Sequence, residues 1–186
     1  IEYTTAGGTV QWICFAGTIM YESTDEGATW TSRATGLTAA YWSLAIYREG
    51  AVNVLLCANG TNLKQWDGTN LTNISNIQAG TKYVAVFNDR IAAAGGNGPT
   101  VGFSKVNDVD TWASPDGFSV KFTTHDNKTD ITGLFQLGTL LLAWDKNSFG
   151  YSEGFGFNTI TVAAGARGIS RSIGCIAPRT IKAVGG

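Results

Sequence analysis

Charged residues are scarce in this chain, which carries 13 Lys and Arg against 14 Asp and Glu among its 186 residues. Tight binding of nucleic acid depends on a basic surface that neutralises phosphates. A formal net charge of −1 therefore gives no indication of strong, salt-dependent binding of DNA or RNA, although passive contact with DNA stays open. The chain contains one histidine, His125. Its polar neighbours predict that it lies in an exposed turn.

Cysteine is also sparse. Cys14, Cys57 and Cys175 are widely separated, and none of them belongs to a Cys-x-x-Cys pair. An odd number of isolated cysteines suits neither a disulfide scaffold nor a zinc site. We expect three buried free thiols.

Long apolar runs and nucleotide-binding loops are absent from the sequence. No stretch approaches the roughly 18 apolar residues that a membrane-spanning helix needs. There is no Walker loop and no dinucleotide fingerprint. The sequence therefore predicts neither a membrane span nor a cofactor.

What the chain does have is glycine and aromatic residues. It contains 24 glycines, 11% aromatic residues and 44% hydrophobic residues overall. This composition favours many short strands joined by tight turns over helices. We predict a single all-β domain with a substantial core.

A recurring order of three strands indicates an internal repeat. An alternating strand, a very apolar strand and a more polar strand follow one another at intervals of about 40–50 residues, which is the spacing of β-propeller blades. The first strands are expected at 42–47, 83–87, 131–137 and 180–184, the second at 11–16, 52–58, 91–94 and 139–144, and the third at 20–23, 63–66, 101–104 and 149–152.

The second strands decide between two architectures. Val54–Ala58 and Leu140–Trp144 are apolar on both faces, so both faces must be covered. Stacked blades achieve this, which favours a β-propeller over the alternative, a β-sandwich. We expect about four blades, at 1–38, 39–80, 81–122 and 123–176, with a further blade beginning at 177–186, and we expect the chain to be part of a longer polypeptide.

One turn has a sharp local pattern. Ser23–Trp30 fits Ser-x-Asp-x-Gly-x-Thr-Trp, which resembles the Asp-box found between strands of β-propellers. We expect Asp25 to accept hydrogen bonds from backbone N–H groups, Gly27 to adopt a positive φ, and the Trp30 ring to be buried against the neighbouring strand. The predicted site is therefore structural, made of Ser23, Asp25, Gly27, Thr29 and Trp30, with Asn107–Trp112 in a comparable place in a later blade.

The second half of the chain resembles the propeller-like neck and tail proteins of tailed bacteriophages, such as packaged-DNA stabilisation and tubular nozzle proteins. The likeness is carried by the order of three segments, Gly102–Trp112, Asp130–Ser148 and Ile169–Ile181. It implies a structural virion protein, made in the host cytoplasm, without catalytic residues. It also implies a ring homo-oligomer that contacts portal, adaptor or tail components, with a weakly acidic lumen through which DNA passes.

The sequence contains one hydrolase-like pattern and six arginines that could suggest an enzyme. Gly150–Gly154 fits Gly-x-Ser-x-Gly, but no helix-forming segment follows Ser152, and His125 precedes the serine, so a hydrolase triad is not expected. A sialidase needs an arginine cluster for its anionic substrate, together with acidic and tyrosine groups. The arginines follow no such pattern, and Arg90 is expected beside a hairpin turn; they are Arg33, Arg48, Arg90, Arg167, Arg171 and Arg179.

The alternative function is a propeller that binds or hydrolyses glycans. Tyr41, Trp42, Phe155 and Phe157 are the aromatic residues best placed to stack on a sugar, although packing between blades explains them equally well. We predict a protein that is not an enzyme.

Two acidic loops could offer oxygen ligands to calcium. Neither Asn107–Asp110 nor Asp126–Asp130 has the spacing of an EF-hand loop. We therefore expect these carboxylates to cap turns, and no metal site is predicted.

Overall fold

The computed structural model describes residues 1–186 except 97, 114, 122–129, 147–148, 154–166 and 171–186. Every regular element in this part of the chain is a β-strand, which confirms the all-β prediction. The strands form four antiparallel sheets of four strands each. Within each sheet, strands that are consecutive in the chain are also neighbours.

Sheets 1 and 2 come from the first half of the chain. Sheet 1 contains β1 (Glu2–Thr4), β2 (Val10–Ala16), β3 (Ile19–Ser23) and β4 (Thr31–Ala34), and sheet 2 contains β5 (Ser43–Glu49), β6 (Val52–Ala58), β7 (Leu63–Trp66) and β8 (Leu71–Asn73).

Sheets 3 and 4 follow. Sheet 3 contains β9 (Tyr83–Phe87), β10 (Arg90–Ala94), β11 (Thr100–Phe103) and β12 (Phe118–Lys121), and sheet 4 contains β13 (Gly133–Leu137), β14 (Leu140–Trp144), β15 (Phe149–Glu153) and β16 (Arg167–Ser170).

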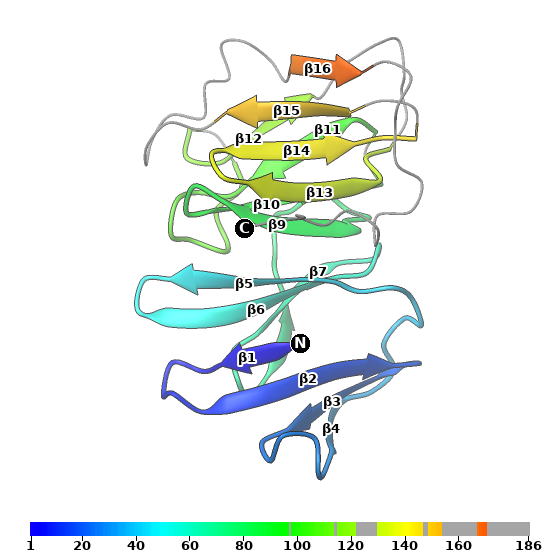
Figure 1. Ribbon diagram of the computed structural model, residues 1–186, viewed down its shortest axis with the longest axis vertical. Coiled ribbons are helices and arrows are strands. Elements are labelled where there is room, and N and C mark those ends of the chain that lie inside the picture. Colours follow the sequence, from blue (N-terminus) through cyan, green and yellow to red (C-terminus); the bar gives the residue numbers. More distant parts are fainter. Residues whose placement is uncertain (97, 114, 122–129, 147–148, 154–166, 171–186) are drawn as a thin grey trace.

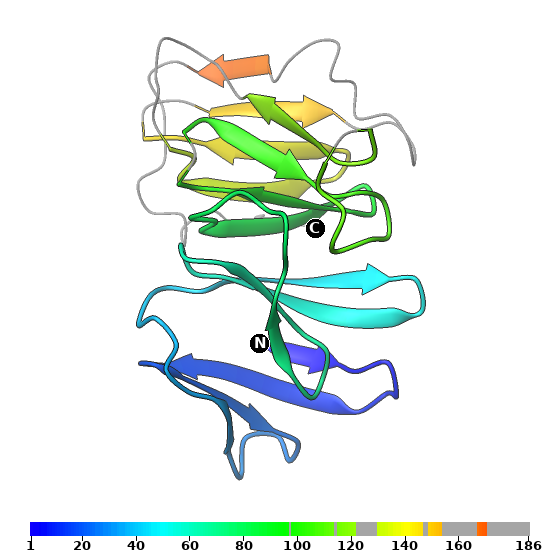
Figure 2. The same ribbon diagram turned by 180° about the vertical axis from the view of Figure 1, so that it is seen from behind.

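The four sheets succeed one another in chain order along the long axis of the molecule (Figure 1). Sheet 1, in blue, lies at one end and sheet 4, in yellow, at the other, and the reverse view agrees (Figure 2). The first strands β5, β9 and β13 lie next to one another, so sheets 2 to 4 each contribute the first strand to a common inner edge.

A separate hydrophobic cluster fills each gap between consecutive sheets. Leu55 and Cys57 of β6 pack towards sheet 1, whereas Val54 and Leu56 of the same strand pack towards sheet 3. All four side chains are buried, as the two-sided apolar pattern predicted. Burying a leucine side chain contributes about 1.5–3 kcal/mol, so the second strands hold the stack together.

Hairpin turns use residues that tolerate left-handed backbone. Asn88 and Asp89, with φ of 50° and 55°, form the two-residue turn between β9 and β10, and Arg90 follows it as predicted. This conformation matches the twist of the paired strands. Gly117 has another role, because a Cβ there would overlap the backbone of Trp112.

The cysteines only partly follow expectation. Cys57 is buried, but Cys14 is exposed, so the prediction of a buried thiol was wrong for Cys14. Cys14 pairs with Tyr21 on the face of sheet 1 that is opposite to buried Ile13, and this face points away from sheet 2. Cys175 lies outside the described residues.

Candidate functional site

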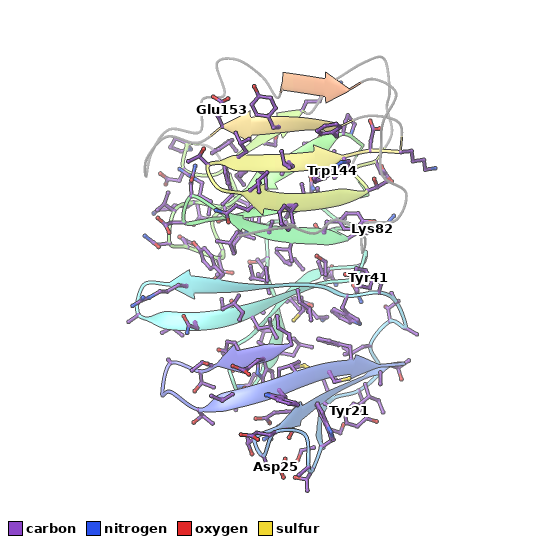
Figure 3. All side chains as sticks on the ribbon, viewed as in Figure 1. Tyr21, Asp25, Tyr41, Lys82, Trp144 and Glu153 are labelled. Carbon is purple, nitrogen blue, oxygen red and sulfur yellow. The ribbon has the colours of Figure 1, made fainter. Side chains whose placement is uncertain are left out.

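The Ser23–Trp30 turn connects β3 to β4 at the sheet 1 end of the molecule, where Figure 3 shows Asp25. Ser23 Oγ donates a hydrogen bond to Asp25 Oδ1 over 2.6 Å and accepts one from Gly27 N over 2.9 Å. Asp25 also accepts from Thr29, at Oδ1 from the backbone N–H over 2.9 Å and at Oδ2 from the hydroxyl over 2.6 Å. These bonds from Ser23 and Thr29 lower the pKa of Asp25 to about 2.

Two further predictions for this turn have different outcomes. Gly27 has a φ of 90°, as expected. The Trp30 ring was predicted to be buried, but it is 44% exposed, so that prediction was wrong. Trp30 precedes the outermost strand β4, and its ring flanks Gly27 together with the Trp12 ring, since a Cβ at Gly27 would lie 3.7 Å from one and 3.3 Å from the other.

The same connection in the next two sheets is also closed by an aspartate. After β7, Asp67 Oδ1 accepts hydrogen bonds from Thr69 N and Asn70 N, both over 2.7 Å. After β11, Asp108 accepts from Asp110 N over 2.8 Å and from the backbone and hydroxyl of Thr111, each over 2.9 Å.

The first acidic loop, Asn107–Asp110, therefore caps its own turn as expected. Burial raises the pKa of Asp108, but the hydrogen bonds from Asp110 and Thr111 outweigh burial and lower it. Asp130, at the end of the other acidic loop, accepts a hydrogen bond from Gly98 N over 3.0 Å. The described residues contain no group of three or more His, Cys, Asp or Glu that could hold a metal ion.

Tyrosines on the first strands join consecutive sheets. Tyr3 of β1 donates its hydroxyl hydrogen to Asn53 O of sheet 2 over 2.5 Å. Tyr47 of β5 donates to Asp89 O of sheet 3 over 2.9 Å, and its oxygen accepts from Asp108 N over 3.1 Å. Burial raises the pKa of Tyr47 to about 12, and it also raises the pKa of Tyr3.

A buried glutamine makes a second joint. Gln11 of β2 accepts a hydrogen bond at Oε1 from Trp66 Nε1 and donates one from Nε2 to Gly68 O, both over 2.9 Å. Both polar atoms of this side chain are therefore satisfied by sheet 2, as a buried amide requires. Sequence patterns had not indicated these joints, because their partners lie more than 40 residues apart.

A groove of 340 Å³ crosses the first strands of sheets 2 to 4. Tyr41, Tyr83 and Phe135 supply its aromatic lining, and Ser43 and Gln136 supply its side-chain polar groups. No lining residue is charged. Tyr41 is 46% exposed and lies at the edge of sheet 2 (Figure 3).

A second groove, of 430 Å³, lies between the outer strands of sheet 3 and the connection from β8 to β9. Trp112 and Phe118 line it, with Asn76 and Gln78 from the connection. One sequence signal lay close to this groove, since Trp112 ends the Asn107–Trp112 segment.

The sugar-stacking candidates are not brought together. Trp42 is buried and stacks on Phe15 with ring centroids 4.3 Å apart, which corresponds to the alternative of packing between blades. Tyr41 is the exposed member of the set. Phe155, Phe157 and His125 lie outside the described residues.

The arginines that are described bind separate local partners. Arg33 forms an ion pair with buried Glu22 on the neighbouring strand. Arg48 donates to Gly50 O, and Arg90 donates to Ser104 O and Asp116 O while its guanidinium lies 5.2 Å from the centre of the Phe118 ring. Each of these three arginines is therefore engaged by groups of its own blade.

Ser152, the serine of the Gly-x-Ser-x-Gly pattern, lies within strand β15 and is buried. A nucleophile elbow requires the serine at a sharp turn between a strand and a helix. The strand position of Ser152 therefore does not provide the geometry of that elbow.

Comparison with known proteins shows a likeness in structure only. YCF48 from Cyanidioschyzon merolae, a β-propeller protein, matches 89% of this chain with a TM-score of 0.56 and 16% identity. The fold is that of a β-propeller. No protein-family description matches the chain, and no curated protein matches it in sequence.

Two further solved structures are similar to the chain. The surface component PorZ of the type-IX secretion system of Porphyromonas gingivalis matches 86% of it, at 16% identity and a TM-score of 0.47. The computationally designed protein Ika8 matches 89% of it, at 12% identity and a TM-score of 0.45. The chain spans about half the length of the YCF48 structure, with 55% covered, and 21% of PorZ. We call each four-stranded sheet of this propeller fold a blade. The described part of the chain contains no helix that could cross a membrane.

Proposed function

We propose that this propeller is a non-catalytic structural protein of a tailed-phage neck or tail, forming part of a ring or tube through which DNA passes. The observation that supports this most directly is the way in which the Gly102–Trp112 segment joins two blades through its backbone N–H groups. This segment carries part of the likeness to phage neck and tail proteins. Its polar groups join blades: Asp108 N donates to Tyr47 of blade 2, and Val109 N donates to Glu49 Oε1 over 3.2 Å.

Several titratable side chains that could serve in catalysis hold turns and loops in place instead. Asp25 and Asp108 close turns, and Arg90 binds two backbone carbonyls. Such groups stabilise the positions of loops and strands and need no substrate to explain them. These contacts are consistent with a structural role for the protein.

The outward face of blade 1 supports assembly with other subunits. Val10 is 45% exposed and Trp12 38% exposed on the side opposite to blade 2, and Cys14 lies beside them on the same strand. Inside the chain, the corresponding surfaces of blades 2 and 3 are buried against the preceding blade. Exposed apolar side chains gathered on one sheet face favour contact with another protein surface. We assign such contacts to portal, adaptor or tail proteins and to other copies in a ring.

The inner groove suits passive passage of DNA. Its lining from Tyr41, Ser43, Tyr83 and Phe135 offers no basic group, so phosphates would gain no counter-charge from this wall. A neutral wall would let DNA pass without retention.

Mass spectrometry of purified virions tests the proposal. Particles of the phage that encodes the chain are expected to contain its peptides after density-gradient purification, in a constant ratio to the portal protein. A known virion protein from the same preparation serves as the positive control. If the peptides are found in infected cells but never in purified particles, the chain is not a virion component.

A further inference from the structure

The 430 Å³ groove on the outer side of blades 2 and 3 has the lining of a small-ligand site. It is open to the surface and bounded by four parts of the chain that the fold brings together. The lining residues are Asn76, Ile77, Gln78, Thr100, Gly102, Trp112, Gly117, Phe118 and Ser119. From its aromatic floor, its amide and hydroxyl groups and its lack of charge, we propose that this groove binds a neutral saccharide. The proposal is independent of the role in a virion.

Trp112 is held in a fixed orientation on the wall of the groove. Its indole Nε1 donates a hydrogen bond to Val109 O over 2.7 Å, within the loop that Asp108 closes. The six-membered part of the ring lies close to Gly102, where a Cβ would be 3.8 Å from it. A sugar ring can rest its apolar face on such a pre-oriented indole without a cost for ordering the side chain.

Gly102 leaves space beside this ring. It lies on β11, pairs with Ser119 of β12, and has a backbone that does not require glycine, because its φ is not positive. Any larger residue at position 102 would therefore project into the groove. Because Gly102 has no side chain, the face of the β11–β12 pair is open beside Trp112.

Polar side chains surround the aromatic wall. Ser119 and Asn76 are exposed, and Thr100 stands on the same face of β11 as Gly102. Gln78 is anchored by a hydrogen bond from Nε2 to Ala93 O over 3.1 Å. Amides and hydroxyls can both donate and accept hydrogen bonds, which matches the hydroxyl groups of a sugar.

Two other ligand classes fit less well. No lining residue is charged, so an anionic or cationic ligand would be desolvated without a counter-charge. An extended peptide would gain most by pairing with the outer edge of β12, which is the last strand of its sheet among the described residues, but the groove covers the face of β11 and β12. A neutral saccharide would bind to this face through hydrogen bonds to the side chains and through stacking on the aromatic rings.

The test compares two matched substitutions. Ser119→Tyr places a bulky side chain in the groove, and Ser32→Tyr makes the same change at an exposed position on β4, the corresponding outer strand of blade 1. Binding is measured first on an array of neutral and sialylated glycans, and then by calorimetry with the neutral oligosaccharide that binds best. Thermal melts of both variants confirm that each is folded.

We expect saturable binding of a neutral oligosaccharide, loss of affinity by at least about tenfold in Ser119→Tyr and in Trp112→Ala, and no change in Ser32→Tyr. Proton saturation-transfer spectra should show contact between the sugar ring hydrogens and the protein. The proposal is overturned if no neutral glycan on the array binds, if sialylated glycans alone bind, or if Ser119→Tyr binds as tightly as the unmodified chain.

Discussion

Replacing Tyr47 with phenylalanine tests whether tyrosine hydroxyls join the blades. The hydroxyl group lies in the gap between blades 2 and 3, where it donates to Asp89 O and accepts from Asp108 N. Removing it leaves one carbonyl and one N–H without these partners while the ring still fills its place in the core. An ordinary hydrogen bond contributes about 0.5–1.5 kcal/mol, so two of them give about 2 kcal/mol.

This loss is measurable by unfolding in urea and by thermal melting. For a chain of this size, about 2 kcal/mol lowers the melting temperature by about 4–8 °C. Tyr21→Phe is the control, because no hydrogen bond of the Tyr21 hydroxyl is found among the described residues and the ring lies on the outward face of blade 1. If Tyr47→Phe is no less stable than Tyr21→Phe, the hydroxyl does not join the blades.

The pH dependence of stability gives a second readout of the same group. The pKa of Tyr47 is raised from 10.0 to about 12 in the folded chain. The unfolded chain therefore loses the proton first, so the stability from this group is complete below pH 10 and is lost as the pH rises towards 12. Tyr47→Phe should show a shallower decline over this window, and an unchanged decline would assign the effect to other groups.

Three shorter predictions concern the turns, the thiols and a close contact. Because the pKa of Asp25 is lowered from 3.8 to about 2, its contribution to stability should be lost as the pH falls from about 4 through 2. In urea titrations over this pH range, Asp25→Asn should lose less stability than the unmodified chain. An unchanged pH dependence would contradict this. Cys14 should react with iodoacetamide in the native protein, whereas Cys57, buried and with a raised pKa, should react only after unfolding, as peptide mass spectrometry can show; equal rates would refute the assignment of burial. Gly117→Ala should lower stability by about 1–3 kcal/mol, because the added methyl group overlaps the Trp112 backbone, and a melting temperature equal to the unmodified chain would contradict that packing.

Much of the fold could be predicted because its strongest signals are local. The run from Val54 to Ala58 is apolar on both faces, and the structure buries both faces between blades. Arg90 was expected beside a hairpin turn, and Asn88 and Asp89, which precede it, adopt positive φ. Asp25 was expected to cap its turn from the pattern of its neighbours, and it does so.

Other strands gave no comparable signal. The fourth strands β4 and β8 are mostly exposed, so neither alternation nor an apolar run marks them. Strand β1 has only three residues and gains its place by pairing with β2. Trp30 could be recognised by its pattern, but its exposure depends on the outer position of the strand that follows it.

The candidate sites could not be predicted because they depend on distant residues. Tyr47 meets Asp108 across 61 positions of sequence, and Gln11 meets Gly68 across 57. The outer groove combines Asn76, Gly102 and Trp112 from different segments. No local pattern describes such a surface, since it arises from the stacking of blades.

The central claim is that this propeller is a structural part of a phage neck or tail, and imaging of intact virions by electron cryomicroscopy tests it most directly. The account predicts propeller density that fits the four blades at the neck or tail, repeated around the channel that holds the DNA. Antibody labelling of the same particles should mark that position. Complete neck and tail density that leaves no place for these blades would contradict the account.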